Sequence, residues 1–126
     1  MRLLFVYGSL RWAGWNAHFL VDAVFVGEAK TVERFSLFVD SISGLPYLTT
    51  DCVSRVVGEV YAVPDAALAE IDVLEGHPES YCRCPVIVEL ADGSMVDGEA
   101  YFWQHSTEDL ELVSSGDWLE TCDDPA

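Results

Sequence analysis

The chain is dominated by short segments in which apolar and polar residues alternate, with the two-residue period typical of β-strands. Residues 2–7 form an almost wholly apolar run, which favours a fully buried strand. A short extended piece is expected after the turn residues Gly44 and Pro46. Asp92 and Gly93 favour a tight hairpin between the last two expected strands. Alternation predicts strands at 23–32, 34–40, 54–63, 81–90 and 96–103, and the last two of these are the strands of the hairpin.

Helical spacing is clearest in residues 64–76. Leu68, Ile71 and Leu74 recur at intervals of three residues, which would place them on one face of a helix. A proline opens this segment and Gly76 closes it, as is common at the two ends of a helix. A well-formed helix is therefore expected here.

A shorter helix is expected at 14–23, with Asn16 as its N-cap and with Phe19 and Leu20 facing the core. Many short strands and few helices together predict an α+β fold. The specific expectation is a small mixed β-barrel with flanking short helices.

The chain length predicts a single domain over residues 1–126. Hydrophobic residues make up 51 % of the chain, so a sizeable core is expected. Residues 106–126 form an acidic C-terminal tail, in which Trp118 and Leu119 are available for packing.

The charge balance is strongly acidic, with 22 acidic and 6 basic residues and a formal net charge of −16. No Lys or Arg follows Arg83, although 11 acidic residues do. Because such a chain repels phosphate groups, we expect no nucleic-acid partner. Solubility is the simpler explanation of the acidity.

Apolar runs in the sequence are all shorter than the roughly 18 to 20 residues that a membrane span needs. The N-terminal run is also too short for a secretion signal. We therefore expect a cytoplasmic protein with no membrane partner. The sequence does not indicate an oligomeric state.

Cysteine and histidine residues do not form a recognisable metal-binding pattern. Cys82 and Cys84 would share one face of an expected strand, but no second cysteine pair and no suitably spaced histidine accompany them. Buried free thiols are therefore favoured over metal or redox chemistry, and no metal site is expected.

The first expected strand ends on Tyr7, Gly8, Ser9 and Leu10. Backbone N–H groups there would lack sheet partners, and Gly8 would let a ligand approach the main chain. Such donors suit a carboxylate or a phosphate. Taken alone, a plain strand exit is the simpler interpretation of these four residues.

Glu75 ends the second expected helix, between Leu74 and Gly76. A helix C-terminus disfavours a carboxylate, and a pocket would raise the pKa of Glu75 further. A carboxyl group with a raised pKa is a useful general base and acid near neutral pH. An exposed glutamate is the simpler alternative. Asp72 and Glu79 compete for the role, and Asp72 could also raise the pKa of Glu75.

Sequence motifs for covalent catalysis or cofactor binding are missing. The sequence contains no Gly-x-Ser-x-Gly elbow, no P-loop and no dinucleotide fingerprint. The expected chemistry therefore needs no cofactor and rests on one carboxylate and backbone donors.

Four short motifs occur in order along the chain, and they are "FVYGSLR", "GLPYL", "GEVYAV" and "IDVLEGHPESYCRCPV". Together they resemble the γ-glutamylcyclotransferase-like superfamily, and the resemblance extends from about Leu3 to Trp103. The pattern is most similar to the γ-glutamylamine cyclotransferase and AIG2-like branch. The ending "SGDW" also looks like one that recurs in this group.

The resemblance implies a small mixed barrel and an intramolecular reaction. The α-amine of a γ-glutamyl amide would attack its own side-chain carbonyl, giving 5-oxoproline and a free amine. The family's catalytic glutamate falls on Glu75, and a tyrosine near the pocket falls on Tyr81. The family's substrate-holding loop falls on Tyr7, Gly8, Ser9 and Leu10.

Several questions stay open at this point. Arg11 could pair with a substrate carboxylate or lie in solvent, while Trp12 and Trp15 could cover the pocket or, more simply, pack. The leaving amine could belong to an amino acid, a lysine isopeptide, a polyamine or a biosynthetic intermediate. Two non-catalytic alternatives are a module that binds a small acidic metabolite and an acidic protein-interaction domain.

Overall fold

Strands form most of the regular structure in the computed structural model, which describes residues 1–11 and 17–119. The strands are β1 (Arg2–Val6), β2 (Val24–Thr31), β3 (Phe35–Val39), β4 (Pro46–Ser54), β5 (Val57–Val63), β6 (Tyr81–Leu90), β7 (Met95–Trp103) and β8 (Glu111–Leu112). The helices are η1 (Ala17–Leu20), a 3₁₀ turn, and α1 (Asp65–Glu75).

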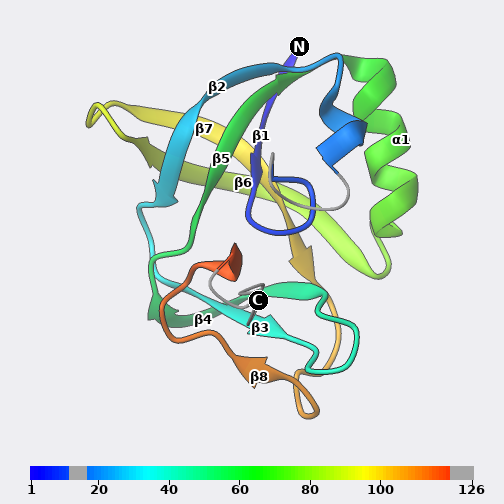
Figure 1. Ribbon diagram of the computed structural model, residues 1–126, viewed down its shortest axis with the longest axis vertical. Coiled ribbons are helices and arrows are strands. Elements are labelled where there is room, and N and C mark those ends of the chain that lie inside the picture. The colour runs from blue at the N-terminus through cyan, green and yellow to red at the C-terminus, as the bar shows by residue number, and fades with distance from the viewer. Residues whose placement is uncertain (12–16, 120–126) are drawn as a thin grey trace, which may run out of the picture.

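A closed barrel is the main feature of the described residues, with the strand order β1-β5-β2-β6-β7 (Figure 1). Most neighbouring strands run antiparallel, but β1 and β7 close the barrel in parallel, with Leu4 opposite Glu99. The predicted α+β class and small mixed barrel with short flanking helices are therefore confirmed. The hairpin of β6 and β7 around Asp92 and Gly93 is also confirmed.

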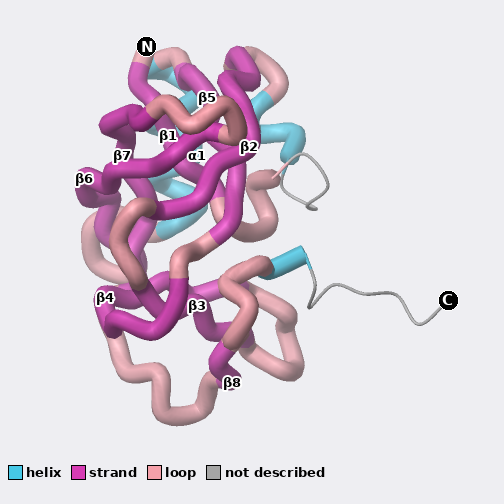
Figure 2. The backbone as a smooth tube through the Cα atoms, turned by 90° about the vertical axis from the view of Figure 1, so that its left-hand side faces the viewer, coloured by secondary structure: helices cyan, strands magenta, loops and turns pink. Residues whose placement is uncertain are grey.

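A second sheet, in the order β4-β3-β8, lies at one end of the barrel in both views of the backbone (Figures 1 and 2). Strand β8 pairs with β3, and the Trp118 side chain is fully buried, with its indole N–H donating to the Gly44 carbonyl at 2.9 Å. The segment expected as an acidic tail is thus part of the fold as far as residue 119, because this tryptophan anchors it.

Strand β1 contributes to two hydrophobic clusters, which explains its continuous apolar run. Phe5 belongs to the cluster inside the barrel, and Leu4 belongs to the cluster between the barrel and helix α1. Because successive side chains of a strand point to opposite faces, both faces of β1 need apolar residues. Burial on both sides fixes β1, and the loop that follows it, firmly in the structure.

Helix α1 covers the outside of the barrel beside η1 (Figure 1). Its Leu68 and Ile71 are buried, as the spacing predicted, whereas Leu74 is 40 % exposed. Gly76 ends the helix in a left-handed conformation with φ of +65°, which glycine adopts without strain. The shorter helix forms only as the 3₁₀ turn η1.

The expected N-cap of that shorter helix, Asn16, lies outside the described residues. Of the two residues expected to face the core there, Leu20 is buried and Phe19 is partly buried against the same cluster. In the part of the chain that the structure covers, neither helix is long and apolar enough to cross a membrane.

Candidate active site

A cavity of about 220 Å³ lies between the loop after β1, the start of β4 and the C-terminal end of α1. Every residue predicted to bind or convert a substrate, except Arg11, contributes to its wall. These residues are Tyr7, Gly8, Ser9, Leu10, Glu75 and Tyr81. Segments more than sixty residues apart in the sequence therefore meet around one cavity.

The loop 7–10 is held in a turn, in which the Arg11 N–H donates to the Gly8 carbonyl at 2.9 Å. Gly8 is required for close packing, because a Cβ atom there would lie 2.2 Å from the Pro46 Cγ. The space that we expected a ligand to use at this glycine is thus filled by Pro46. Among the described residues, the N–H groups of Gly8 and Leu10 have no acceptor, so they can still donate to a ligand.

Glu75 is the last residue of α1, and its carboxyl group faces the cavity. Burial raises the pKa of Glu75 from 4.5 to about 7. No hydrogen bond or ion pair reaches this carboxyl group within the described residues. Glu75 is therefore partly desolvated and free to exchange a proton near neutral pH.

Three tyrosine rings surround Glu75. Burial is the main cause that raises the pKa of Tyr7, Tyr81 and Tyr101, and the charge of Glu75 adds to it in each case. For Tyr101, the hydrogen bond to Asp72 and the charge of Asp72 contribute more than Glu75 does. Each hydroxyl group already donates a hydrogen bond of 2.6 Å, from Tyr7 to the Tyr101 carbonyl, from Tyr81 to the Pro46 carbonyl and from Tyr101 to Asp72 Oδ1. The rings are thus fixed as neutral phenols that form an apolar wall around the carboxyl group.

Asp72 does not have the role that its spacing from Glu75 suggested. Its carboxylate accepts from Tyr101 and lies 3.3 Å from an Arg83 guanidinium nitrogen. Burial accounts for the raised pKa of Glu75, so the expected contribution of Asp72 is not found. The competitor Glu79 has an exposed side chain and is not part of the cavity wall.

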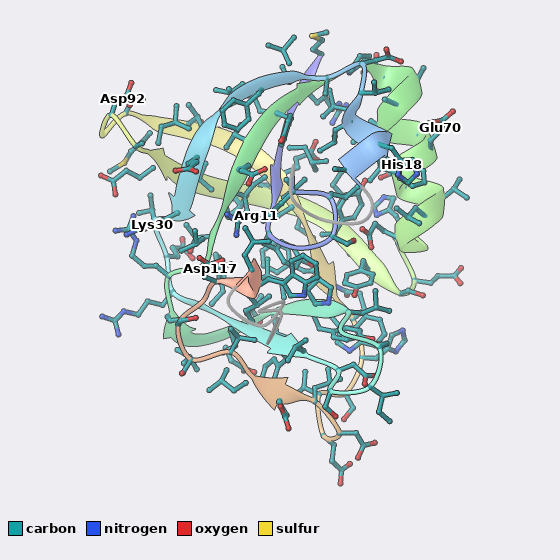
Figure 3. The ribbon with its side chains drawn as sticks, in the orientation of Figure 1. Arg11, His18, Lys30, Glu70, Asp92 and Asp117 are labelled. Atoms are coloured by element: carbon teal, nitrogen blue, oxygen red, sulfur yellow. The ribbon has the colours of Figure 1, made fainter. Side chains whose placement is uncertain are left out.

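The position of Arg11 also differs from the expectation. Its side chain neither faces a substrate nor lies in solvent. Its side chain is buried and forms ion pairs with Glu59 Oε2 at 3.0 Å and with Asp117 Oδ1 at 2.8 Å (Figure 3). Glu59 is fully buried on β5 and also accepts from the Tyr61 hydroxyl group at 3.0 Å. A buried carboxylate needs such a partner, which explains why Arg11 turns inward.

Tyr101, Leu45 and Pro46 also line the cavity, although the sequence analysis gave them no role. Leu45 and Pro46 belong to the quoted motif "GLPYL", which was one available signal. Tyr101 lies on β7 opposite Arg83, on the strand face that packs toward α1, and its alternation pattern is that of any buried strand residue. Only the closed barrel brings it to the site.

The cysteine pair was expected to be buried, but Cys82 and Cys84 are only partly buried. They do share one face of β6, with their sulfur atoms 3.3 Å apart. Over the described residues, no group of three or more His, Cys, Asp or Glu side chains could hold a metal ion. Trp12, Trp15 and Cys122 lie outside the described residues.

Comparisons with known proteins agree with the fold. Residues 4–120 match the family model described as gamma-glutamyl cyclotransferase, AIG2-like. A Methanocaldococcus jannaschii protein provisionally named a gamma-glutamylcyclotransferase is 40 % identical over 122 residues, which cover 95 % of this chain and 98 % of the relative. The gamma-glutamylcyclotransferase family protein YtfP of Escherichia coli K12 is 32 % identical over 117 residues, or 93 % and 96 % of the two chains.

Solved structures give the same result. The crystal structure of an AIG2-like protein from Mus musculus superposes with a TM-score of 0.83 at 28 % identity, over 90 % of this chain and 86 % of that one. Both the sequence and the fold therefore match over nearly the whole chain. The chain belongs to the gamma-glutamyl cyclotransferase, AIG2-like family.

Proposed function

We propose that this protein converts a γ-glutamyl amide into 5-oxoproline and a free amine, with Glu75 as general base and then general acid. The observation that carries the proposal is the Glu75 carboxyl group in the cavity. It has no internal partner among the described residues, and its pKa is raised to about 7. The family membership of the chain supports the same reaction class.

The proposed reaction is an intramolecular acyl transfer. The Glu75 carboxylate removes a proton from the α-ammonium group, and the freed amine attacks the γ-carbonyl carbon. A C–N bond then forms in the five-membered ring while the original amide C–N bond breaks. The proton held by Glu75 passes to the leaving nitrogen, and the attacking nitrogen gives up its second proton, which the released amine takes up to become an ammonium ion. No co-reactant is consumed, and one carboxyl group serves as base and then as acid.

The loop 7–10 supplies the groups that would hold the substrate. The N–H groups of Gly8 and Leu10 can donate to an α-carboxylate, and the packing of Gly8 against Pro46 keeps them in place. Because the nucleophile and the carbonyl belong to one molecule, holding a folded conformer removes much of the barrier. A cavity of about 220 Å³ is small, which suits the glutamyl part and leaves the amine at the opening.

The test is release of 5-oxoproline from a panel of γ-glutamyl amides by the purified protein. We expect Glu75→Gln to reduce kcat by at least about 100-fold, the usual contribution of a general acid-base residue. Glu70→Gln is the matched control, because Glu70 is exposed on the same helix and points away from the barrel (Figure 3). Near-wild-type turnover by Glu75→Gln, with the fold intact, would contradict the proposal.

A further inference from the structure

Cys82 and Cys84 form a pair of free thiols on β6 that the proposed reaction does not use. Their sulfur atoms lie 3.3 Å apart, and the Cys84 thiol donates a hydrogen bond to the Cys82 sulfur. Neither residue belongs to the wall of the cavity around Glu75. The pair is therefore a second group of reactive side chains, separate from the candidate active site.

The barrel fixes the position of this pair. Because alternate residues of a strand share one face, Cys82 and Cys84 lie side by side wherever β6 is formed. Phe102 and Ala100 of β7 lie opposite them and belong to the hydrophobic cluster inside the barrel. Cys84 packs against that cluster. The two sulfur atoms are thus held together by regular structure.

Among the described strands, β6 has a neighbour on only one edge beside the pair. Strand β6 pairs with β7 over residues 81–89, but it pairs with β2 only over residues 88–90. The barrel wall is therefore incomplete beside Cys82 and Cys84. Both side chains are only partly buried, so a small molecule can reach them from solvent.

A disulfide suits the pair better than a metal ion, because the described residues supply no third ligand beside it. An S–S bond is about 2.05 Å long, and the Cα atoms of bonded cysteines lie about 4.4 to 6.8 Å apart. Alternate residues of a strand are about 6.4 to 6.8 Å apart, at the upper end of that range. Rotation of the side chains can therefore close the bond, and external thiols should reduce it readily.

The two thiols differ in their readiness to react. Burial, and next the hydrogen bond with Cys82, raises the pKa of Cys84 to about 11. Because the thiolate is the nucleophile, the first attack on an external molecule falls to Cys82. Once Cys82 is bonded to another sulfur, its charge and its hydrogen bond no longer oppose the ionisation of Cys84. Cys84 is then suited to the second attack.

We propose that Cys82 and Cys84 form a thiol–disulfide exchange site that low-molecular-weight disulfides oxidise reversibly. The Cys82 thiolate attacks one sulfur of the external disulfide, forms a mixed disulfide and releases one thiol. Cys84 then loses its proton, attacks the Cys82 sulfur and releases the second thiol. Two electrons pass to the external disulfide, and the two protons end on the two released thiols. This inference does not depend on the proposed function.

Treatment of the purified Cys122→Ser protein with bis(hydroxyethyl) disulfide tests the proposal. This disulfide is uncharged, so the acidic protein does not repel it. Cys122 lies outside the described residues, and its replacement leaves Cys84 as the only cysteine after Arg83. Because trypsin cleaves after Arg83, a bond between Cys82 and Cys84 links the two tryptic peptides on either side. We expect mass spectrometry to find this link.

Cys52 is the internal control, because it is exposed on β4 and should keep one external thiol as a mixed disulfide. Adding Cys84→Ser to the parent Cys122→Ser protein removes the intramolecular second step. We therefore expect at least about 10-fold more adduct on Cys82 than the parent protein retains. Excess mercaptoethanol should restore both free thiols of the parent protein.

Two results would overturn the proposal. One is a pair that stays unmodified while Cys52 reacts. The other is the presence of stable adducts on Cys82 and Cys84 with no link between their peptides. Both are measured on the folded parent protein, so they do not depend on the stability of the Cys84→Ser variant.

Discussion

Glu75 shows how burial alone can prepare a carboxyl group for acid-base chemistry. Its pKa is raised to about 7 without a neighbouring carboxylate, because the surrounding wall contains tyrosine rings whose hydroxyl groups are bonded elsewhere. The sequence resemblance indicated the residue, and the position at a helix C-terminus indicated the direction of the shift. The cause, desolvation by the rings, needed the folded structure.

The raised pKa of Glu75 also predicts a dependence of stability on pH. Between about pH 4.5 and 7 the folded protein keeps this proton and the unfolded chain loses it, so the stabilisation is present at low pH and is lost as pH rises through 7. Glu75→Gln removes the titration. Relative to this variant, we expect the free energy of unfolding of the wild type to fall by up to about 3 kcal/mol between pH 5 and 8.

Urea unfolding of both proteins at the two pH values measures this difference. Glu70→Gln, on the exposed face of α1, is the control and should run parallel to the wild type. A constant difference between wild type and Glu75→Gln across this range would show that Glu75 has an ordinary pKa in the folded protein.

At the scale of the elements, local sequence patterns predicted the helices and strands whose formation depends on residues close to one another in the sequence. Helix α1 ends at Gly76 as expected, and the β6–β7 hairpin follows from Asp92 and Gly93. Strand β8 has two residues and forms only because β3 lies beside it, so no local pattern could predict it. The second half of β4 is polar and exposed, so its sequence resembles that of a loop. It too is a strand because β3 lies beside it.

Three separate elements are joined by the buried arginine. Arg11 follows the cavity loop, Glu59 lies on β5, and Asp117 belongs to the motif "SGDW" near Trp118. Arg11→Met leaves the fully buried Glu59 without this partner. We expect a loss of about 3 to 5 kcal/mol in the free energy of unfolding, as is usual when one member of a buried pair is removed.

Denaturant unfolding of three variants tests that expectation. The double variant Arg11→Met with Glu59→Gln should recover part of the lost stability, since no buried charge remains. Arg2→Met is the control, because Arg2 pairs with Glu99 at an exposed position and such pairs contribute about 0 to 1 kcal/mol. Equal losses for Arg11→Met and Arg2→Met would show that the Arg11 pairs add little.

At the scale of the whole molecule, the site exists only because the barrel closes. The cavity wall combines the loop after β1, the start of β4, the end of α1 and residues of β6 and β7. The resemblance of the sequence to a family could name Glu75 and the loop 7–10. It could not name Tyr101, and it left Arg11 undecided, because their positions depend on strand pairing and on a buried ion pair.

The pH dependence of kcat/KM for 5-oxoproline release tests the central claim most directly, because it reports the ionisation of groups in the free enzyme and free substrate. Glu75 must be ionised to accept the first proton, so we predict that kcat/KM falls tenfold per pH unit below about pH 7. The residual activity of Glu75→Gln should lack this limb. A wild-type profile that stays flat down to about pH 5, or a limb that persists unchanged in Glu75→Gln, would contradict the account.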